Sequence, residues 1–432
     1  MINLEKKPAE KLLISIIGGT IWGNRGAEAM LVTTIGKLRE QFPDARFNVF
    51  SYYPFRDRAL AQDAAVAVLS AKPASLATRH FFGALIGMTF KRIGLKIPQK
   101  GFFKIACALS QSDILLDIGG ITFSDGREKY LPFNILTIWP ALMLGVPVVK
   151  LAQAAGPFRN PLNCVLAKTF LGRCRYFFAR GKKTAEFLSE LGLSKDQFDL
   201  TADIAFLYRP EFSLSNENES LVQDVLKRMD SAITLGKKIV VFSPSILVLS
   251  ESRSQGLDYV DRFLSLVRDL GSKKYFFVFM PNATRQGSKK SHNNDLLALE
   301  QFRSQAESGS LTEDLLSSVS WIDFDINTSS VRKVISRAEV LVCSRYHAMV
   351  SGLAEGIPTV VVGWGHKYRE TMDYFGMTEY SLNFAEREIN LSNVVKSVLN
   401  NREKISKKIK QNQPAVFNLA EKQFNFLFRE LA

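Results

Sequence analysis

The sequence predicts an α/β protein built from two doubly wound, Rossmann-like domains that face a cleft, and three observations support this. The chain has 432 residues, of which 46% are hydrophobic and 23% charged, enough for two ordinary globular domains. Short apolar runs alternate with amphipathic helical patterns, which is typical of parallel strands joined by helical crossovers. This alternation stops in a polar stretch near the middle of the chain and then starts again.

The first half of the chain supplies the first series of elements. Its opening apolar run, 12–17, leads into glycines, and the next segment repeats apolar residues at helical spacing (Met30, Leu31, Ile35, Leu38). Expected strands lie at 12–17, 47–52, 66–69, 113–117, 147–151 and 176–179, and expected helices at 27–40, 134–144, 161–171 and 182–191.

The second half repeats this pattern after a polar, partly acidic segment. Expected strands lie at 239–242, 275–280, 321–324, 340–343 and 359–362, with helices that include 329–337 and 347–355. We therefore divide the chain into an N-terminal domain (1–208), an interdomain linker (209–236), a C-terminal domain (237–390) and C-terminal helices that pack back on the body (391–432).

Charge and cysteine usage narrow the class of protein. The formal net charge of +14 favours anionic partners, but no nucleic-acid recognition motif accompanies it, so we expect no nucleic acid. The cysteines lie in apolar segments without metal-ligand spacing (Cys107, Cys164, Cys174, Cys343), and the histidines form no cluster. We expect a cytoplasmic protein with reduced thiols and no bound metal. The uncharged stretch 131–149 contains prolines and a glycine, which favours a helix and a strand over a membrane span.

One stretch departs from the alternating pattern. No Asp or Glu occurs between Ala64 and Ser112, whereas basic residues and large apolar residues are interleaved there, most densely over 72–104. Such a mixture suits an element that lies on the inner face of the cytoplasmic membrane. A helix pair that packs on the core and turns a basic face outward explains it equally well.

The sharpest local pattern is Ser344-Arg345-Tyr346-His347, which joins an expected strand to an expected helix. A helix N-terminus favours anions, and Arg345 adds a guanidinium suited to carboxylate or phosphate. His347 is able to donate a proton. Lys367 follows the next strand and lies on the same rim. The structural alternative is that Arg345 pairs with a carboxylate and His347 only packs.

The first domain has its own polar residues at expected strand ends. The loop Gly18–Gly26 contains Asn24 and precedes Glu28, whose simplest role is to complement a helix dipole. Further along, the polar residues at strand ends are Asp117 before Gly119-Gly120, Gln153 before Gly156-Pro157, Arg180 and Asp203. Their recurrence at successive strand ends is difficult to explain by packing, because the strand interiors are apolar.

These motifs, in this order, resemble the polysaccharide pyruvyl transferase family over residues 14–374. The segments that carry the resemblance are Gly23-Asn24-Arg25-Gly26-Ala27-Glu28-Ala29, Asp117-Ile118-Gly119-Gly120, Gln153 with Gly156-Pro157, Phe177-Phe178 with Arg180, Asp203-Ile204-Ala205-Phe206, Ser344-Arg345-Tyr346-His347, Gly356-Ile357-Pro358 and Lys367. Many relatives carry Asp where this chain has Ala27, which weakens any catalytic role for an acid at that position.

The resemblance implies a fold similar to B-type glycosyltransferases, with phosphoenolpyruvate as donor and a sugar or lipid-linked oligosaccharide as acceptor. It implies a transferase that makes a pyruvyl ketal during surface or capsular polysaccharide synthesis, with no cofactor besides the donor. The expected catalytic residues are His347, Arg345, Glu28 and Asp117. Expected donor ligands are Ser344, Arg345, His347, Lys367 and Arg180, and expected acceptor ligands are Asn24, Gln153 and Asp125.

Two other functions remain open from the sequence. A B-type glycosyltransferase that uses a nucleotide sugar would share the architecture, although no paired-carboxylate motif for a ribose is evident. A non-catalytic, membrane-associated partner in a polysaccharide assembly complex would account for the segment 72–104 but not for the polar residues at so many strand ends.

Overall fold

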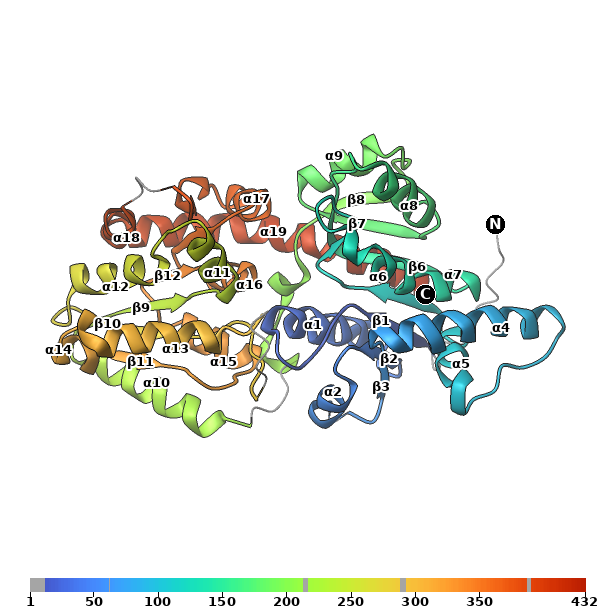
Figure 1. Cartoon of the computed structure of the whole chain (residues 1–432), viewed down its shortest axis with the longest axis horizontal. Coiled ribbons are helices and arrows are strands. Elements are labelled where there is room, and N and C mark those ends of the chain that lie inside the picture. The colour runs from blue at the N-terminus through green and yellow to red at the C-terminus, as the bar shows by residue number, and fades with distance from the viewer. Residues whose placement is uncertain (1–11, 62, 213–216, 288–292, 387–389) are drawn as a thin grey trace. The chain divides into compact units, whose positions relative to one another are not determined.

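The computed structural model describes residues 12–61, 63–212, 217–287, 293–386 and 390–432 (Figure 1). The described chain forms two compact units. The first contains residues 12–22, 27–212 and 417–432, and the second contains residues 23–26 and those from 217 to 416. The glycine loop that the sequence assigns to the N-terminal domain is therefore divided, because its last four residues pack within the second unit.

A fully parallel sheet forms the centre of the first unit. Its strand order is β3 (Val66–Ser70), β2 (Arg46–Ser51), β1 (Leu13–Ile17), β4 (Ile114–Asp117), β6 (Val148–Ala155), β7 (Tyr176–Arg180) and β8 (Phe198–Thr201), and the short β5 (Ile121–Thr122) pairs with β6. Ile14 lies opposite Phe47 on one side and Ile114 on the other. Because both faces of the sheet are covered, its strands consist mostly of apolar residues.

Helices lie on both sides of this sheet (Figure 1). They are α1 (Arg25–Gln41), α2 (Pro54–Leu60), α3 (Pro73–Ser75), α4 (Phe81–Arg92), α5 (Lys104–Ser110), α6 (Leu131–Leu136), α7 (Trp139–Met143), α8 (Pro161–Leu171) and α9 (Lys182–Glu190). The single helix expected at 134–144 is wrong, because α6 and α7 are separate. Pro140 lacks the backbone N–H that a continuous helix needs there, so it lies in the first turn of a new helix.

The second unit also contains a fully parallel sheet. Its strand order is β11 (Val319–Trp321), β10 (Tyr275–Phe279), β9 (Lys238–Ser243), β12 (Val340–Cys343), β13 (Thr359–Gly363) and β14 (Ser381–Asn383). The strand expected at 321–324 instead ends at Trp321 and begins at Val319. The sequence pattern concealed this start, because Ser320 is a polar residue that is completely buried.

Helices again surround the second sheet (Figure 1). They are α10 (Glu219–Thr234), α11 (Ile246–Ser254), α12 (Tyr259–Leu270), α13 (Leu296–Gln305), α14 (Glu313–Ser317), α15 (Thr328–Ile335), α16 (Tyr346–Ala354), α17 (His366–Tyr374), α18 (Leu391–Asn400) and α19 (Arg402–Leu431). No helix in the described part of the chain is long and apolar enough to cross a membrane.

Most of the segment expected to be a linker, 209–236, is helix α10. Its buried residues, Val222, Val225, Leu226, Met229 and Ala232, recur at helical spacing and face the second unit. The acidic residues at its start obscured this periodicity in the sequence, and residues 213–216 lie outside the described chain. At the other end, α19 returns to the first unit, where the Thr201 hydroxyl donates to the Leu419 carbonyl at 2.9 Å.

Each sheet has one position where the order of its strands reverses. In the first unit this position lies between β1 and β4, and in the second it lies between β9 and β12. Crossovers leave in opposite directions on either side of such a position, so a crevice opens at the carboxyl ends of the two strands. The polar motifs at 117–120 and 344–347 follow β4 and β12, which places each of them at the reversal of its own sheet.

Candidate functional site

The turn between β12 and α16 is the centre of the polar cluster in the second unit. Ser344 extends β12 by donating its backbone N–H to the Ser243 carbonyl at 2.9 Å. Arg345 follows in extended conformation at the N-cap of α16, and Tyr346 and His347 form the first turn of that helix. Because helix dipoles are positive at the N-terminus, this turn favours negative charge beside His347.

The Arg345 guanidinium pairs with Asp295, a residue to which the sequence assigned no role. Its Nε lies 3.0 and 2.9 Å from the two carboxylate oxygens of Asp295, and its Nη2 lies 2.5 Å from Oδ1. The Asp295 side chain is fully buried, whereas that of Arg345 is 12% exposed. Nη1 of Arg345 donates to the Asn293 side chain at 3.2 Å. Arg345 therefore pairs with a carboxylate, which is the structural alternative that the sequence left open.

Asp295 also holds two backbone segments in place. Its Oδ1 accepts from the Ile246 N–H at 3.1 Å, and its Oδ2 accepts from the N–H groups of Asn282 and Ala283 at 3.3 and 2.9 Å. One carboxylate thus joins the ends of β9 and β10 to the guanidinium that precedes α16. We infer that Arg345 and Asp295 position the turn rather than offer a free charge.

The Ser344 side chain is buried and already hydrogen-bonded. Its hydroxyl lies 2.6 Å from the Tyr259 hydroxyl, and its carbonyl accepts from the Tyr368 hydroxyl at 3.2 Å. Burial raises the pKa of both phenols above their usual range, so both keep their protons as donors. The Ser344 side chain faces the interior, so a contact between Ser344 and a ligand stays a prediction that this geometry does not favour.

His347 is half-buried and lies against the backbone of Gly26. A Cβ atom built on Gly26 would lie 2.0 Å from His347 Nδ1 and 2.1 Å from its Cγ, so any side chain there would displace the ring. The His347 ring also meets the Tyr346 ring edge-on, with 5.2 Å between centroids. The first glycine loop and the Ser-Arg-Tyr-His motif, although more than 300 residues apart, therefore share one site in the second unit.

Further contacts fix the loop 23–26 in this unit. The Arg25 N–H donates to the Asn282 carbonyl at 3.1 Å, and the Thr328 hydroxyl donates to the Arg25 carbonyl at 2.9 Å. The Arg285 guanidinium donates to the Gly23 carbonyl. Asn24, an expected acceptor ligand, uses its side-chain oxygen to cap α1 by accepting from the Gly26 N–H at 3.1 Å.

Four cationic side chains lie in the segments around His347, namely Arg25, Arg285, Arg345 and Lys367. Arg345 pairs with Asp295, and Arg25 lies 3.8 Å from Asp325. Lys367 is half-buried, and its ammonium lies over the rings of Tyr346 and Tyr368 at 5.4 and 5.3 Å. The cluster is therefore suited to an anionic ligand.

A second polar cluster lies at the strand reversal of the first unit. Asp117 ends β4, and its Oδ2 lies 2.5 Å from Nζ of Lys150, which is fully buried in β6. Its Oδ1 accepts from the Gly119 N–H at 3.0 Å, and its carbonyl accepts from the Gln153 side chain at 2.9 Å. The expectation that Asp117 is a free catalytic base is not supported, because its carboxylate is neutralised by Lys150.

Gly18 allows β1 and β4 to end side by side in this cluster. A Cβ atom at Gly18 would lie 2.5 Å from the Gly119 nitrogen and 2.8 Å from Asp117 Oδ1, and its φ of +89° is in the region that favours glycine. The pKa of Tyr52 is raised, mainly because its phenol is buried and also because the negative charge of Asp117 lies near it.

Arg180 is also held internally. Its Nη1 lies 2.6 Å from Asp203 Oδ2, and its Nη2 donates to the Gly120 carbonyl at 2.7 Å. Asp203 accepts in turn from the Ala205 N–H at 2.9 Å. Arg180 thus connects the glycine turn after β4 with the segment after β8. Its role as a donor ligand stays a prediction.

The two remaining predicted residues lie elsewhere in the first unit. Asp125 organises the turn before α8, where it accepts from the N–H groups of Arg159 and Asn160 at 2.7 and 3.2 Å and from the Asn163 side chain at 2.8 Å. These bonds fix the Asp125 carboxylate, and its contact with an acceptor stays a prediction. Glu28 lies in the first turn of α1 and is almost completely buried, two residues after Gly26.

The structure thus separates the predicted residues into two groups. Ser344, Arg345, His347, Lys367 and Asn24 belong to the second unit, and Glu28, Asp117, Asp125, Gln153 and Arg180 belong to the first. Sequence reasoning missed Asp295, Lys150, Arg285 and Tyr259. Lys150 alone left a signal, namely a lysine inside an apolar strand, whereas Asp295 looked like an ordinary helix start.

Comparison with known sequences identifies relatives along most of the chain. The family model described as polysaccharide pyruvyl transferase matches residues 24–366. The amylovoran biosynthesis protein AmsJ of Erwinia amylovora is 21% identical over 418 residues, which cover 92% of this chain and 94% of AmsJ. The matched range begins in the first glycine loop and ends at the start of α17.

Similar solved structures share the architecture at low sequence identity. The UDP-GlcNAc 2-epimerase of Neisseria meningitidis aligns with a TM-score of 0.58 and 13% identity, covering 97% of this chain and all of that one. Anabaena HepE, solved with UDP and glucose, aligns with a TM-score of 0.55 and 12% identity over 97% of this chain and all of HepE. These similarities establish the two-domain fold of the B-type glycosyltransferases, as the sequence predicted.

Proposed function

Because the chain belongs to the polysaccharide pyruvyl transferase family, we propose that it moves the pyruvyl group of phosphoenolpyruvate onto two hydroxyl groups of a sugar, as a ketal. The acceptor would be a repeat unit of a surface or exopolysaccharide, free or on a lipid carrier. The relationship to a protein of amylovoran biosynthesis supports this choice of acceptor class.

The observation that carries the proposal is the positively charged cluster around the first turn of α16. Phosphoenolpyruvate brings a carboxylate and a phosphate, so it needs more than one positive group. Lys367, Arg285 and the positive end of the α16 dipole provide them. A nucleotide sugar also carries phosphates, and for this reason the donor must be tested directly.

The reaction needs one proton delivered and two removed. A proton added to C3 of phosphoenolpyruvate makes C2 electrophilic, and the first sugar hydroxyl attacks C2 and loses its proton. The C2–O bond to phosphate then breaks, and the second hydroxyl attacks C2 and loses its proton as the ketal closes. One of the two hydroxyl protons replaces the proton delivered to C3, and the other leaves on inorganic phosphate.

We assign the proton delivery to His347. Its ring lies at the N-terminus of α16, next to the cationic cluster. The contact with Gly26 fixes the position of the ring. Lys367 binds the phosphate or the carboxylate as a point charge. Arg345 acts as a positioning residue through Asp295, which is a revision of the direct contact that the sequence suggests.

Glu28 is the remaining candidate for the base, because Asp117 is neutralised by Lys150. Gln153 and Arg180, both tied to the glycine turn after β4, would act on substrates only by shaping that turn. The proposed chemistry uses protons and charge alone, so we expect activity to withstand chelation of divalent ions by EDTA.

The test is to incubate the purified chain with phosphoenolpyruvate and a panel of free and lipid-linked oligosaccharides, and to measure inorganic phosphate and product mass together. Acceptor-dependent phosphate release, with a product heavier by one pyruvyl group, is the expected result. If a nucleotide sugar raises the melting temperature while phosphoenolpyruvate does not, and glycosyl transfer occurs, the chain is a glycosyltransferase instead.

Variants then test the assigned roles. His347→Gln should abolish phosphate release, and Lys367→Gln should raise KM for phosphoenolpyruvate, while both keep the melting temperature of the original chain. Lys396→Gln, at an exposed lysine of α18, is the matched control. Full product formation by the His347 and Lys367 variants in cells would instead favour a non-catalytic role.

A further inference from the structure

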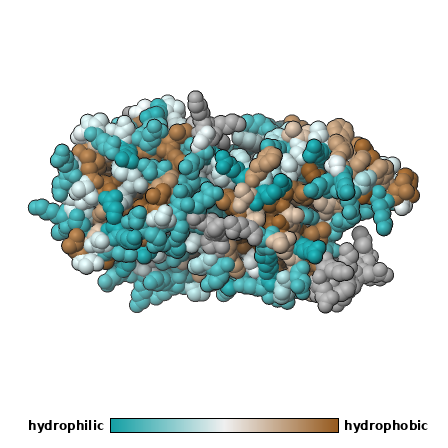
Figure 2. Space-filling model, turned by 90° about the horizontal axis from the view of Figure 1, so that it is seen from below, coloured by the Kyte–Doolittle hydropathy of each residue, from teal (hydrophilic) through white to brown (hydrophobic). Residues whose placement is uncertain are grey.

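The segment from α3 to α5 presents an unusual surface in the first unit. Of the thirteen large apolar side chains that are exposed in the described chain, six lie between residues 82 and 102. They are Phe82, Leu85, Ile86, Ile93, Leu95 and Phe102, and we call this set the apolar ridge. Figure 2 shows hydrophobic residues gathered at the right-hand end, the end where Figure 1 draws α4.

Helix α4 exposes several of its large apolar side chains, which an ordinary surface helix does not. Phe82, Leu85 and Ile86 recur at helical spacing and are 49%, 38% and 39% exposed. The residues buried on the other side are Gly83, Ala84 and Gly87. A helix whose only task is to cover a core in water would bury its large side chains and expose its small ones.

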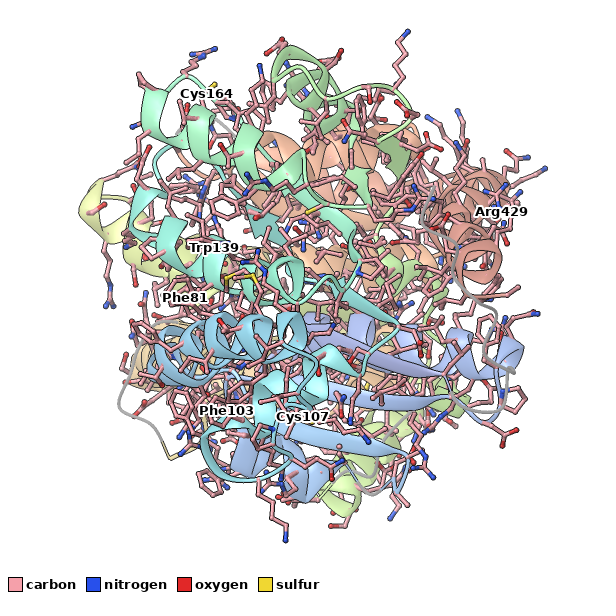
Figure 3. All side chains as sticks on the ribbon, turned by 90° about the vertical axis from the view of Figure 1, so that its right-hand side faces the viewer. Phe81, Phe103, Cys107, Trp139, Cys164 and Arg429 are labelled. Atoms are coloured by element: carbon pink, nitrogen blue, oxygen red, sulfur yellow. The ribbon has the colours of Figure 1, made fainter. Side chains whose placement is uncertain are left out.

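The inner side of α4 is closely packed, so the outward direction of the ridge is fixed. A Cβ atom on Gly83 would lie 3.3 Å from that of Ala106 in α5, and one on Gly87 would lie 2.9 Å from Ile97. Phe81 and Trp139 of α7 pack with 4.9 Å between ring centroids. Figure 3 shows Phe81 beside Trp139, and Phe103 beside Cys107 where α5 packs below. Turning α4 over would require the large side chains to occupy this space.

The segment that carries the apolar ridge is strongly basic and contains no acidic residue. All seven basic residues between Ala64 and Ser112 are exposed, and the same stretch contains no Asp or Glu. They are Lys72, Arg79, Lys91, Arg92, Lys96, Lys100 and Lys104. Elsewhere in the described chain several surface cations pair with carboxylates, as Arg268 does with Asp261.

We propose that the apolar ridge and its surrounding lysines and arginines bind the surface of an anionic lipid membrane. The large side chains of α4 and of the turn after it enter the boundary between headgroups and acyl chains, and the basic side chains contact lipid phosphates. Helix α4 has 12 residues, about 18 Å of helix, which is too short to cross a membrane but sufficient to lie in its surface.

Two other occupants fit this surface less well. A second copy of the chain would bring seven further positive charges against the first seven, with no acidic residue in this stretch to offset them. A nucleic acid would meet Ile and Leu side chains, which neither stack on bases nor hydrogen-bond to them. A lipid surface satisfies both features at once, because it is negative at the headgroups and apolar beneath them.

The test is co-sedimentation of the full chain with vesicles of phosphatidylcholine alone and of phosphatidylcholine with about 30% phosphatidylglycerol, at low and high salt. We expect binding to the anionic vesicles that weakens with salt, and little binding to neutral ones. Replacing Arg92, Lys96 and Lys100 by Gln should weaken binding about 100-fold, since each basic residue near an anionic surface contributes about fivefold. Replacing Ile93, Leu95 and Phe102 by Ser should weaken it by about tenfold or more.

Matched control variants separate the proposed surface from general charge and hydrophobicity. Replacing Lys396, Lys404 and Lys407 by Gln, or Leu221, Ile233 and Leu235 by Ser, changes equally exposed residues of the second unit and should leave binding unchanged. Equal losses in the control and ridge variants would overturn the proposal, as would unchanged binding in the ridge variants. If the chain forms a dimer without vesicles, and the Ser variant of the ridge abolishes that dimer, the surface binds a second copy of the chain instead. These readouts do not depend on the proposed reaction, so each hypothesis is able to fail without the other.

Discussion

Replacing Asp295 by Asn should destabilise the second unit more than any exposed Asp→Asn change. The substitution removes the charge from a fully buried carboxylate that pairs with Arg345 and accepts from three backbone N–H groups. Breaking a buried pair by removing one partner costs about 3–5 kcal/mol. The Arg345 side chain is 12% exposed and regains some hydration when the pair is broken. We therefore expect a loss at the lower end of this range, about 3 kcal/mol.

Urea unfolding, followed by circular dichroism and tryptophan fluorescence, measures this loss. With an m value of about 2 kcal/mol per molar urea, the midpoint should fall by about 1.5 M. Asp261→Asn is the matched control, because Asp261 pairs with Arg268 at 2.8 Å but is 45% exposed. That change should cost less than about 1 kcal/mol. If both variants lose the same stability, the Arg345–Asp295 pair does not hold the unit together.

The same variants distinguish positioning from direct binding by Arg345. If Arg345 acts through Asp295, then Arg345→Gln and Asp295→Asn should lower kcat by similar factors, and the double variant should be no worse than either single one. If Arg345 binds phosphoenolpyruvate directly, Arg345→Gln should raise KM far more than Asp295→Asn does. The latter result would restore the role that the sequence alone suggests.

Three further results are expected. Gly26→Ala should lower turnover at least tenfold in the transfer assay, with little change in the unfolding midpoint, because its Cβ would displace the His347 ring; unchanged turnover would contradict the contact. Burial lowers the pKa of His80 from 6.5 to about 4, so the unfolded chain binds a proton that the folded chain excludes, and stability should fall by up to about 3 kcal/mol as the pH drops from 6.5 towards 4; His80→Gln should flatten this slope in urea titrations at each pH. Brief alkylation followed by mass spectrometry should modify Cys164 alone, since it is the half-buried thiol, while burial raises the pKa of Cys174 to about 12.

The fold was largely predictable because its strands are apolar and its crossovers regular. The strand predicted at 340–343 and the helix predicted at 161–171 have the same bounds as β12 and α8. Prediction failed where local chemistry overrides periodicity. Pro140 divides one expected helix into two, and Ser320 hides the start of β11 because a polar residue sits in a buried strand. Pro140 is visible in the sequence as a possible helix break, whereas the burial of Ser320 depends on the strands beside it.

The candidate site was predictable in position but only partly in chemistry. The sequence placed Arg345 and His347 at a strand end and a helix start, which the structure confirms. It left open that Arg345 pairs with a carboxylate, but it did not identify that carboxylate as Asp295, 50 residues away. A single sequence contains the charges but not the pairs they form, since such pairs depend on which loops the sheet brings together.

Each of the two sheets has a buried ion pair at its strand reversal. In the first unit Lys150 neutralises Asp117, and in the second Asp295 neutralises Arg345. Each pair is buried and bonded to a neighbouring turn, so it holds backbone in position with no net charge. Lys367 lies over the rings of Tyr346 and Tyr368, and His347 contacts the Tyr346 ring at the start of α16, so both lie at the turn where we propose that the donor binds. Substitutions at the pairs should therefore affect stability and kcat together, whereas substitutions at Lys367 and His347 should affect donor binding and turnover in a chain that folds normally.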